Sequence, residues 1–157
     1  SRELITSWGD YQTAIDRLLS IARQKIRAYD EDLTQFKLES ASRMAKLREI
    51  IQGRQPDCLL IIVRNAEPLR QHHPILMKLL ADFGHLAHAR QSPDHLAHLR
   101  DSMLLIDDTH ALIRFERDLP RSKLLIDEPD ELRPYCKRFA ELSGEGGDLI
   151  IATPLGL

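Results

Sequence analysis

The pattern of hydrophobic and polar positions predicts alternating helices and strands. One apolar face at helical spacing is formed by Ile15, Leu18, Leu19 and Ala22. With Asp10 as a plausible cap, this face predicts an amphipathic helix over residues 10–24. The following stretch KIRAYDEDL predicts a short strand that ends in acidic residues. A second helix is expected from Ser40 to Gln52, capped by Ser40 and closed by Gly53.

The stretch CLLIIVRN is a continuous apolar run bounded by Pro56-Asp57 on one side and Asn65-Ala66-Glu67-Pro68 on the other. Because it lacks alternation, it predicts a strand that is buried on both faces. Such strands occur in parallel or mixed sheets that carry helices on each side. The run therefore favours a layered α/β architecture.

The second half of the chain continues this alternation. The predicted elements are a helix that starts at Pro74 and is ended by Gly84, a strand HLAHARQ, a hairpin SMLLIDDTHALIRFE that turns at Asp107-Asp108-Thr109, a strand KLLIDE, a helix over residues 129–142 and a last strand DLIIATP. This order predicts a single layered α/β domain over residues 1–157, with a mixed, mostly parallel sheet flanked by helices.

Composition narrows the class of protein. Hydrophobic residues make up 43% and charged residues 29% of the 157 positions, as in soluble globular proteins. The formal charge of −2 gives no global reason to expect nucleic acid and leaves that partner open. No signal segment or membrane span is found, so we expect a cytoplasmic location. The start without Met suggests a piece of a longer protein. Cys58 and Cys136 lack C-x-x-C spacing, so we expect buried reduced thiols.

The tetrapeptide HLAH occurs twice and raises the question of a metal site. Its histidines, His85 with His88 and His95 with His98, are spaced by three residues. That spacing puts both rings on one side of a helix but on opposite faces of a strand. No zinc signature, phosphate-binding glycine loop or serine elbow occurs, so neither a metal nor a cofactor is expected. We interpret these histidines as surface or hydrogen-bonded groups. We interpret the acidic runs Asp30-Glu31-Asp32 and Asp107-Asp108 as solvated turns.

One segment adds a family resemblance. RDSMLLIDDTHALIRFE resembles the strand-turn-strand of the phospholipase D superfamily, which carries the signature H-x-K-x-x-x-x-D followed by Gly-Ser. With Asp107 on the motif aspartate, Arg100 falls at the histidine, Ser102 at the lysine and Arg114-Phe115 near the Gly-Ser. The order of helices and strands is also similar to one half of a phospholipase D. Of the motif residues, only the aspartate is retained.

The resemblance implies a chemistry that this chain has lost. Members of the family use a histidine nucleophile, a second histidine as general acid and lysines that hold the phosphate. Arg100 cannot be a nucleophile because a guanidinium stays protonated in proteins, and Ser102 supplies no positive charge. We therefore expect no catalytic residue. A shifted register that uses His98 would need a two-residue bulge to reach Asp107. It is kept as the alternative of a homodimeric phosphodiesterase or nuclease.

The leading hypothesis is a non-catalytic, phospholipase D-like binding or regulatory domain in bacteria. Arg100, Ser102, Asp107 and Arg114 are predicted to line the former cleft, where arginine forks suit an anionic, phosphate-containing ligand. Simple surface pairing of these arginines with Asp101 or Asp107 is the other interpretation. The resemblance also implies a homodimer. It points further to a bacterial domain of unknown function found behind GNAT-type acetyltransferase domains, and it thus implies an acetyltransferase domain in the same full-length chain. A pure interaction domain is the third possibility.

Overall fold

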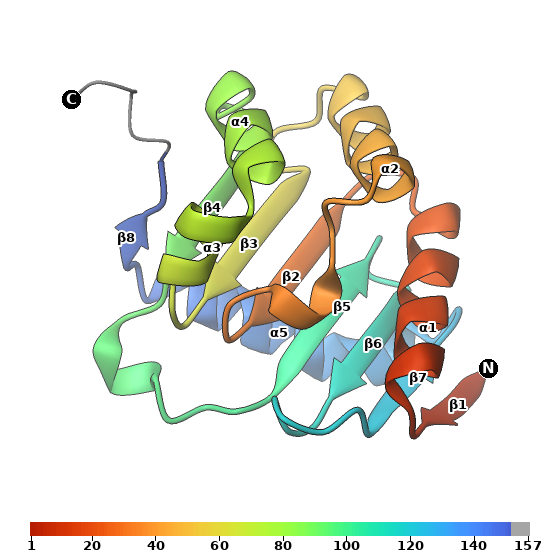
Figure 1. Cartoon of the computed structure of the whole chain (residues 1–157). Coiled ribbons are helices and arrows are strands. Elements are labelled where there is room, and N and C mark those ends of the chain that lie inside the picture. The colour runs from red at the N-terminus through yellow and green to blue at the C-terminus, as the bar shows by residue number, and fades with distance from the viewer. Residues whose placement is uncertain (152–157) are drawn as a thin grey trace.

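The computed structural model describes residues 1–151, which form one eight-stranded mixed sheet in the order β1-β7-β6-β5-β2-β3-β4-β8 (Figure 1). The strands are β1 (Arg2–Ile5), β2 (Ile26–Asp30), β3 (Leu59–Val63), β4 (Ala87–Gln91), β5 (Ser102–Ile106), β6 (His110–Arg114), β7 (Ser122–Leu125) and β8 (Asp148–Leu149). The helices are α1 (Trp8–Ile21), α2 (Ala41–Gln52), α3 (Glu67–His72), α4 (Pro74–Asp82) and α5 (Pro129–Gly144), with short 3-10 turns η1 (Thr34–Phe36) and η2 (Asp94–Leu96).

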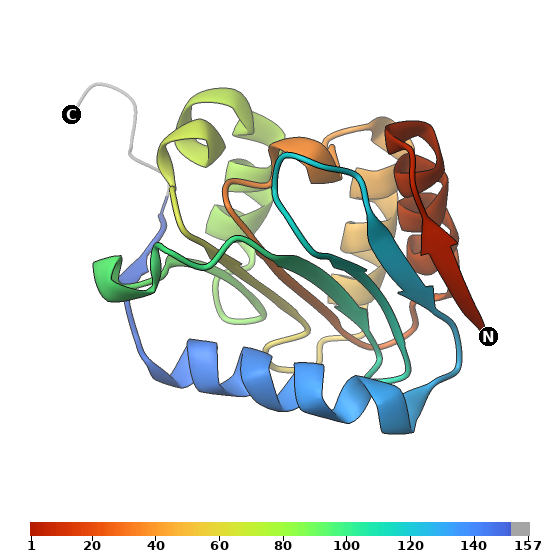
Figure 2. The ribbon, with the colours of Figure 1, turned by 90° about the horizontal axis from the view of Figure 1, so that it is seen from below.

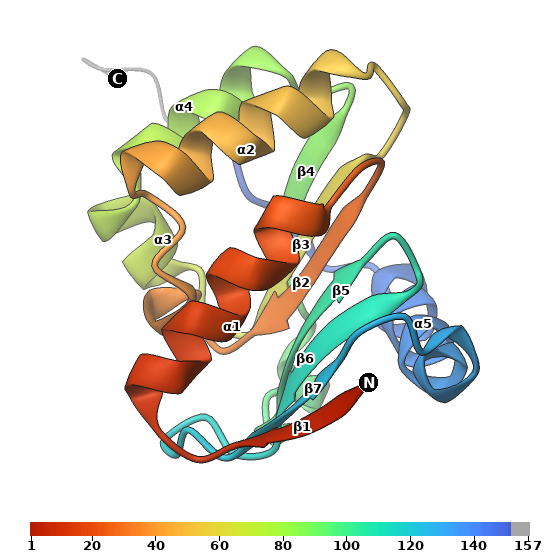
Figure 3. The ribbon, with the colours of Figure 1, turned by 90° about the vertical axis from the view of Figure 1, so that its right-hand side faces the viewer.

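Helices cover both faces of the sheet. Figure 2 and Figure 3 show α1, α2, α3 and α4 on one face and α5 alone along the other. Successive strand residues point to opposite faces, so Ala28 of β2 joins the core beneath α1 and α2, whereas its neighbour Tyr29 joins the core beneath α5. This arrangement confirms the predicted α/β layers.

The sheet is mixed, but the expectation that parallel pairing predominates is wrong. Strands β2, β3 and β4 are parallel, which accounts for two of the seven pairings in the described chain. The reason is the hairpin series β5-β6-β7, whose tight turns allow only antiparallel neighbours. Strand β5 then returns antiparallel to β2 and joins the two halves of the sheet.

Local capping follows elementary rules, with one correction. Ser40 caps α2 as predicted, since its Oγ accepts the backbone N–H of Arg43 at 3.4 Å. The cap of α1 is Ser7 and not Asp10, because the Ser7 Oγ accepts the Asp10 N–H at 3.1 Å. Asp10 instead lies in the first turn, where a carboxylate faces the positive end of the helix dipole.

Two elements were not predicted, and two expectations need correction. In β1 only Ile5 is buried, so no apolar pattern marks the strand. Helix α3 is six residues long and begins at Glu67, within the segment that had been interpreted only as the boundary of the β3 strand. The last strand was expected to run over residues 148–154, but β8 is two residues long and residues 152–157 lie outside the described part. Both cysteines are free thiols; Cys58 is buried as expected, whereas Cys136 is half-buried.

The hairpin turn between β5 and β6 ties the sheet to the preceding loop. Asp107 and Asp108 both adopt left-handed backbone, with φ of 54° and 59°, which aspartate tolerates better than most residues. The Asp107 carboxylate accepts the backbone N–H groups of Arg23 at 2.8 Å, Gln24 at 2.8 Å and Lys25 at 2.9 Å. Asp107 therefore holds the loop between α1 and β2 and is not a solvated turn residue.

Replacing Asp107 by Asn tests this role. The Asn side chain has the shape of Asp and also tolerates the left-handed backbone. Its NH2 group, however, replaces a carboxylate oxygen that accepts backbone N–H groups of the loop, and it cannot accept them. We expect the free energy of unfolding to fall by about 1–3 kcal/mol, measured by urea denaturation. Asp108→Asn is the matched control, because Asp108 is exposed, pairs with Lys25 at 2.5 Å and otherwise accepts only from the Cys136 thiol at 3.5 Å. Its cost should stay under about 1 kcal/mol. Equal effects of the two substitutions would contradict the assignment.

Candidate functional site

The candidate site lies at the edge of the sheet where the parallel strands β2, β3 and β4 end, which we call the carboxyl edge. Ligands of open α/β sheets usually bind at such an edge. Because β5 and β6 pair antiparallel to one another, β5 begins and β6 ends at the same edge. A hollow of about 350 Å³ opens there, lined by Asp30, Glu31, Asp32, Thr34, Gln35, Asn65, Arg114, Arg117 and Asp118.

A buried ion pair occupies the floor of this hollow. Arg114, at the end of β6, is in register with Ser102 at the start of β5. The Arg114 Nη2 donates to Asp30 Oδ1 at 2.7 Å and to Ser102 Oγ at 3.0 Å, and the Ser102 hydroxyl also donates to Asp30. The side chains of Arg114 and Asp30 are each only 1% exposed. Arg114 and Ser102, both predicted from the sequence to lie in one site, are thus brought together. The group that joins them is the carboxylate of Asp30, which was expected to be solvated.

Both charges of this pair are largely satisfied within the protein. The second oxygen of Asp30 accepts the backbone N–H groups of Asp32 at 3.1 Å and Leu33 at 2.7 Å. The Nη1 of Arg114 donates to the Tyr11 hydroxyl at 2.6 Å, and its guanidinium carbon lies 5.0 Å from the centre of the Tyr11 ring. Burial raises the pKa of Tyr11, so its hydroxyl stays neutral. Arg114 Nε has no partner within residues 1–151.

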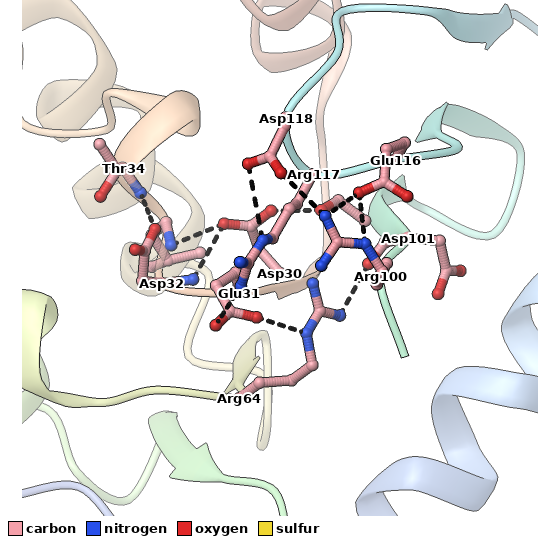
Figure 4. A network of polar contacts seen from close by, with 12 residues as sticks. Asp30, Glu31, Asp32, Thr34, Arg64, Arg100, Asp101, Glu116, Arg117 and Asp118 are labelled. Carbon is pink, nitrogen blue, oxygen red and sulfur yellow. Dashed lines mark hydrogen bonds and ion pairs between the residues drawn. The ribbon is translucent and has the colours of Figure 1, made fainter. Parts of the chain in front are cut away.

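Arg100 does not join the buried pair. Figure 4 shows it among the charged residues beside the hollow, which we call the rim: Glu31, Arg64, Arg100, Asp101, Glu116, Arg117 and Asp118. The Arg100 Nε donates to Glu116 at 2.5 Å, and its Nη2 donates to Asp118 at 2.8 Å. The hydrogen bond from Arg100 lowers the pKa of Glu116 below its ordinary value. The predicted counter-ions of Arg100 were Asp101 and Asp107. Instead, Asp101 forms a two-pronged ion pair with Arg138.

The rest of the rim also consists of paired charges. Glu31 accepts from the Arg64 Nε at 2.8 Å and from the Arg117 Nη1 at 2.9 Å (Figure 4). Arg64 also donates to the Asp101 carbonyl at 2.8 Å, so the rim is linked from β3 to β5. More carboxylates than guanidinium groups line the hollow: Asp30, Glu31, Asp32 and Asp118 against Arg114 and Arg117. An incoming phosphate would therefore meet a net negative surface.

The other sequence candidates lie elsewhere. Asp107 lies at the opposite end of β5, in the turn before β6, where it accepts from the loop before β2, and so does not line the hollow. His98 is exposed, and its Nδ1 contacts the His95 carbonyl at 3.1 Å. His85 is exposed near β4, whereas His88 lies in β4 with its Nε2 3.1 Å from Asp57. In the part of the chain that the structure describes, no group of three His, Cys, Asp or Glu side chains could hold a metal ion.

The residue that organises this edge, Asp30, was missed by the sequence interpretation. It is the first of three consecutive acids, a pattern typical of solvated turns. The available signal was its place directly after the buried run of β2, where a strand end at a sheet edge holds a side chain inside the protein. Tyr11 gave no signal, because an aromatic residue on a helix face is normally core.

Comparisons with solved structures find this architecture in several proteins. Nuc of Salmonella typhimurium, a phospholipase D family member, matches 97% of this chain and 99% of its own with a TM-score of 0.61 at 14% identity. NucT of Helicobacter pylori matches 94% and 98% with a TM-score of 0.58 at 10% identity. TrmBL2, an archaeal chromatin protein described with a novel mode of DNA binding, matches 94% of this chain and 54% of its own, with a TM-score of 0.68 at 10% identity. No protein-family model and no curated protein sequence matches the chain. The fold is phospholipase D-like.

Replacing Arg114 by Met tests the buried pair. The apolar chain fills similar space but leaves the Asp30 carboxylate buried without its counter-ion. We expect the free energy of unfolding to fall by about 3–5 kcal/mol. The double variant with Asp30→Asn should lose less than the sum of the single losses, because the two groups are coupled. Arg100→Met is the control and should leave unfolding almost unchanged, since this arginine is 44% exposed. Additive losses for the pair would overturn the coupling.

Proposed function

We propose that this chain is a non-catalytic domain of phospholipase D-like fold that works by binding a protein partner at its carboxyl edge. The observation that carries the proposal is the buried pair of Arg114 with Asp30, which fills the place where a phosphate would have to be held. Ser102 is part of the same cluster, so its hydroxyl is already engaged.

Three properties of the edge support the loss of catalysis. Arg100 stands at the position of the motif histidine and is engaged by two carboxylates. Ser102 stands at the position of the motif lysine and brings no positive charge. His98, the alternative nucleophile, is exposed and contacts a neighbouring backbone carbonyl. It does not contact Arg114, Asp30 or Ser102, which we call the Arg114 cluster.

The charge of the edge favours a protein partner over an anionic ligand. The hollow carries an excess of carboxylates, and its two arginines are paired. Beside it, the rim loop (residues 115–121) exposes Phe115 and Leu119, which are 45% and 57% exposed. Exposed aromatic side chains beside arginines are typical of protein interfaces. The anionic ligand predicted from the sequence thus stays a prediction without support from this edge.

A second copy of this chain is the partner that the rim fits best. The charges of Arg100, Arg117, Glu116 and Asp118 are paired within one copy. The contact is therefore made by the exposed Phe115 and Leu119, which two copies can place against each other across a two-fold axis. An accessory role beside an acetyltransferase domain of the same chain is compatible with such a dimer. The full reading frame decides that point.

In the described chain no helix is long and apolar enough to cross a bilayer.

A hydrolysis assay tests the loss of catalysis. The protein is incubated with bis-(p-nitrophenyl) phosphate and, separately, with linear DNA, in a metal-free buffer. We expect no turnover above the rate of the buffer, because no histidine, cysteine or lysine among residues 1–151 lines the hollow. The control is His98→Ala. If the unmodified chain turns over substrate and His98→Ala does not, the chain is a phosphodiesterase and the proposal fails.

Sedimentation velocity tests the partner surface. We expect the chain to dimerise, and Phe115→Glu to raise the dimer dissociation constant by about tenfold or more, because a charge then faces the centre of the contact. Ile75→Glu is a matched control, since Ile75 is also 45% exposed but lies on α4, away from the rim. A monomer at all concentrations, or equal effects of both substitutions, would show that the rim is not a dimer contact.

A further inference from the structure

The sheet face beneath α5 is apolar in one half and carries basic side chains in the other. Over β5 and β6 it is apolar, with Met103, Leu105 and Ile113 packed in the same cluster as Phe139 of α5. Over β2 and β4 it turns basic. Register places Arg27 of β2 beside Leu60 of β3, and Leu60 beside His88 of β4. An inward-facing arginine in a sheet covered by a helix needs a reason, because burying a charge is costly.

Two hollows lie between α5 and this half of the sheet. One of about 400 Å³ is lined by Lys25, Arg27, Leu60, Leu105, Asp108, Cys136 and Phe139, among others. The other, of about 380 Å³, is lined by Asp57, Leu60, His88 and Arg90, among others. The acids are engaged, since Asp108 pairs with Lys25 and Asp57 lies 3.1 Å from the His88 Nε2. They share Leu60 and Ser143, so we treat them as one α5 groove. Each hollow has the volume of a small-molecule site, and the first combines apolar walls with a few polar groups, as such sites do.

The cations of the α5 groove are not equally satisfied. Lys25 forms an ion pair with Asp108 at 2.5 Å. Arg27 is half-buried, and its Nη1 donates to the carbonyl groups of Asp57 at 2.7 Å and Ile26 at 3.2 Å. Among residues 1–151, neither Arg27 nor Arg90 forms an ion pair with a carboxylate. Burial lowers the pKa of Arg27, although Asp108 and Asp57 act in the opposite direction. The groove thus holds a guanidinium that an added anion would stabilise.

We propose that the α5 groove binds a small organic anion, a carboxylate or phosphate ester attached to an apolar body. The Arg27 guanidinium receives the anionic group as a fork, and Leu60, Leu105 and Phe139 pack against the body. The groove lies where β2 and β3 begin, at the opposite edge from the Arg114 cluster. The inference is therefore independent of the rim contact and of the loss of catalysis.

Calorimetric titration of the chain with defined probes tests the groove. Octanoate and n-octyl phosphate carry both charge and apolar body. Octan-1-ol carries the body alone, and inorganic phosphate carries the charge alone. We expect at least one of the two amphipathic anions to bind at least about tenfold more tightly than both controls, since a charged hydrogen bond and apolar burial add. Whichever anion binds more tightly identifies the head group. If neither binds, or if either control binds as well, the proposal is overturned.

Variants locate the binding. Arg27→Gln should weaken binding of the amphipathic anion about tenfold or more. Arg27→Lys should retain part of it. Arg133→Gln is the control, because Arg133 lies on α5 but does not line the groove, is 76% exposed and pairs only with Asp130. Ala140→Trp fills the groove from an exposed position on α5, so it should abolish binding even if Arg27→Gln unfolds the chain. Unchanged affinity in Ala140→Trp contradicts the site.

Cys136 gives a second readout within the α5 groove. It lines the hollow and is half-buried, whereas Cys58 is 1% exposed. Burial and the neighbouring Asp108 raise the pKa of Cys136 to about 11, so its alkylation by N-ethylmaleimide is best followed at pH 9. Saturating octanoate or octyl phosphate should slow this reaction several-fold, and Cys136→Ser should remove the signal. An alkylation rate that does not respond to a bound anion would place that anion elsewhere on the protein.

Discussion

The buried ion pair between Arg114 and Asp30 is the interaction on which the rest of the structure depends. It lies where the parallel half of the sheet meets the antiparallel half, since Asp30 ends β2, Ser102 begins β5 and Arg114 ends β6. Through Tyr11 it also reaches α1. A buried ion pair need not stabilise a fold more than apolar residues of the same size, but losing one partner is strongly destabilising. The pair therefore fixes the carboxyl edge in one arrangement.

That arrangement explains why the two ends of the sheet differ. At the carboxyl edge the guanidinium groups are bound to carboxylates of the protein itself, and exposed Phe115 and Leu119 stand beside them. At the opposite edge Asp107 is used for backbone hydrogen bonds, and the half-buried Arg27 has no carboxylate partner within the described chain. The cations of the carboxyl edge are thus paired with carboxylates, whereas the only hydrogen-bond partners of Arg27 within residues 1–151 are backbone carbonyl groups.

Sequence reasoning predicted most of the fold and little of the site, for physical reasons. Buried runs such as CLLIIVRN and capped helices such as the one begun by Ser40 carry their signal locally. Strand β1 carries none, because a strand with one buried residue has no pattern. The partners of an arginine are set by strand register, and a sequence does not state which strands are neighbours. Hence the sequence could indicate Arg114 as a candidate residue but not its partner Asp30, which was interpreted as solvated.

The resemblance to phospholipase D gave the right fold, but it could not say which partners the aligned residues would have. Asp107, which the resemblance set on the motif aspartate, holds a loop and does not face the hollow. Arg100 and Ser102, which it set on the motif histidine and lysine, lie at the carboxyl edge and donate to Asp118 and Asp30.

The most direct test of the central claim is the behaviour of the Arg114 guanidinium in solution, followed by nitrogen-15 NMR of the Nη2–H group that donates to Asp30. If the guanidinium is locked to Asp30 and withheld from ligands, that N–H exchanges slowly with water and its signal does not move when tungstate, a phosphate analogue, is added in excess. Fast exchange together with a saturable shift on tungstate addition would show an open, phosphate-accepting site and would contradict the account.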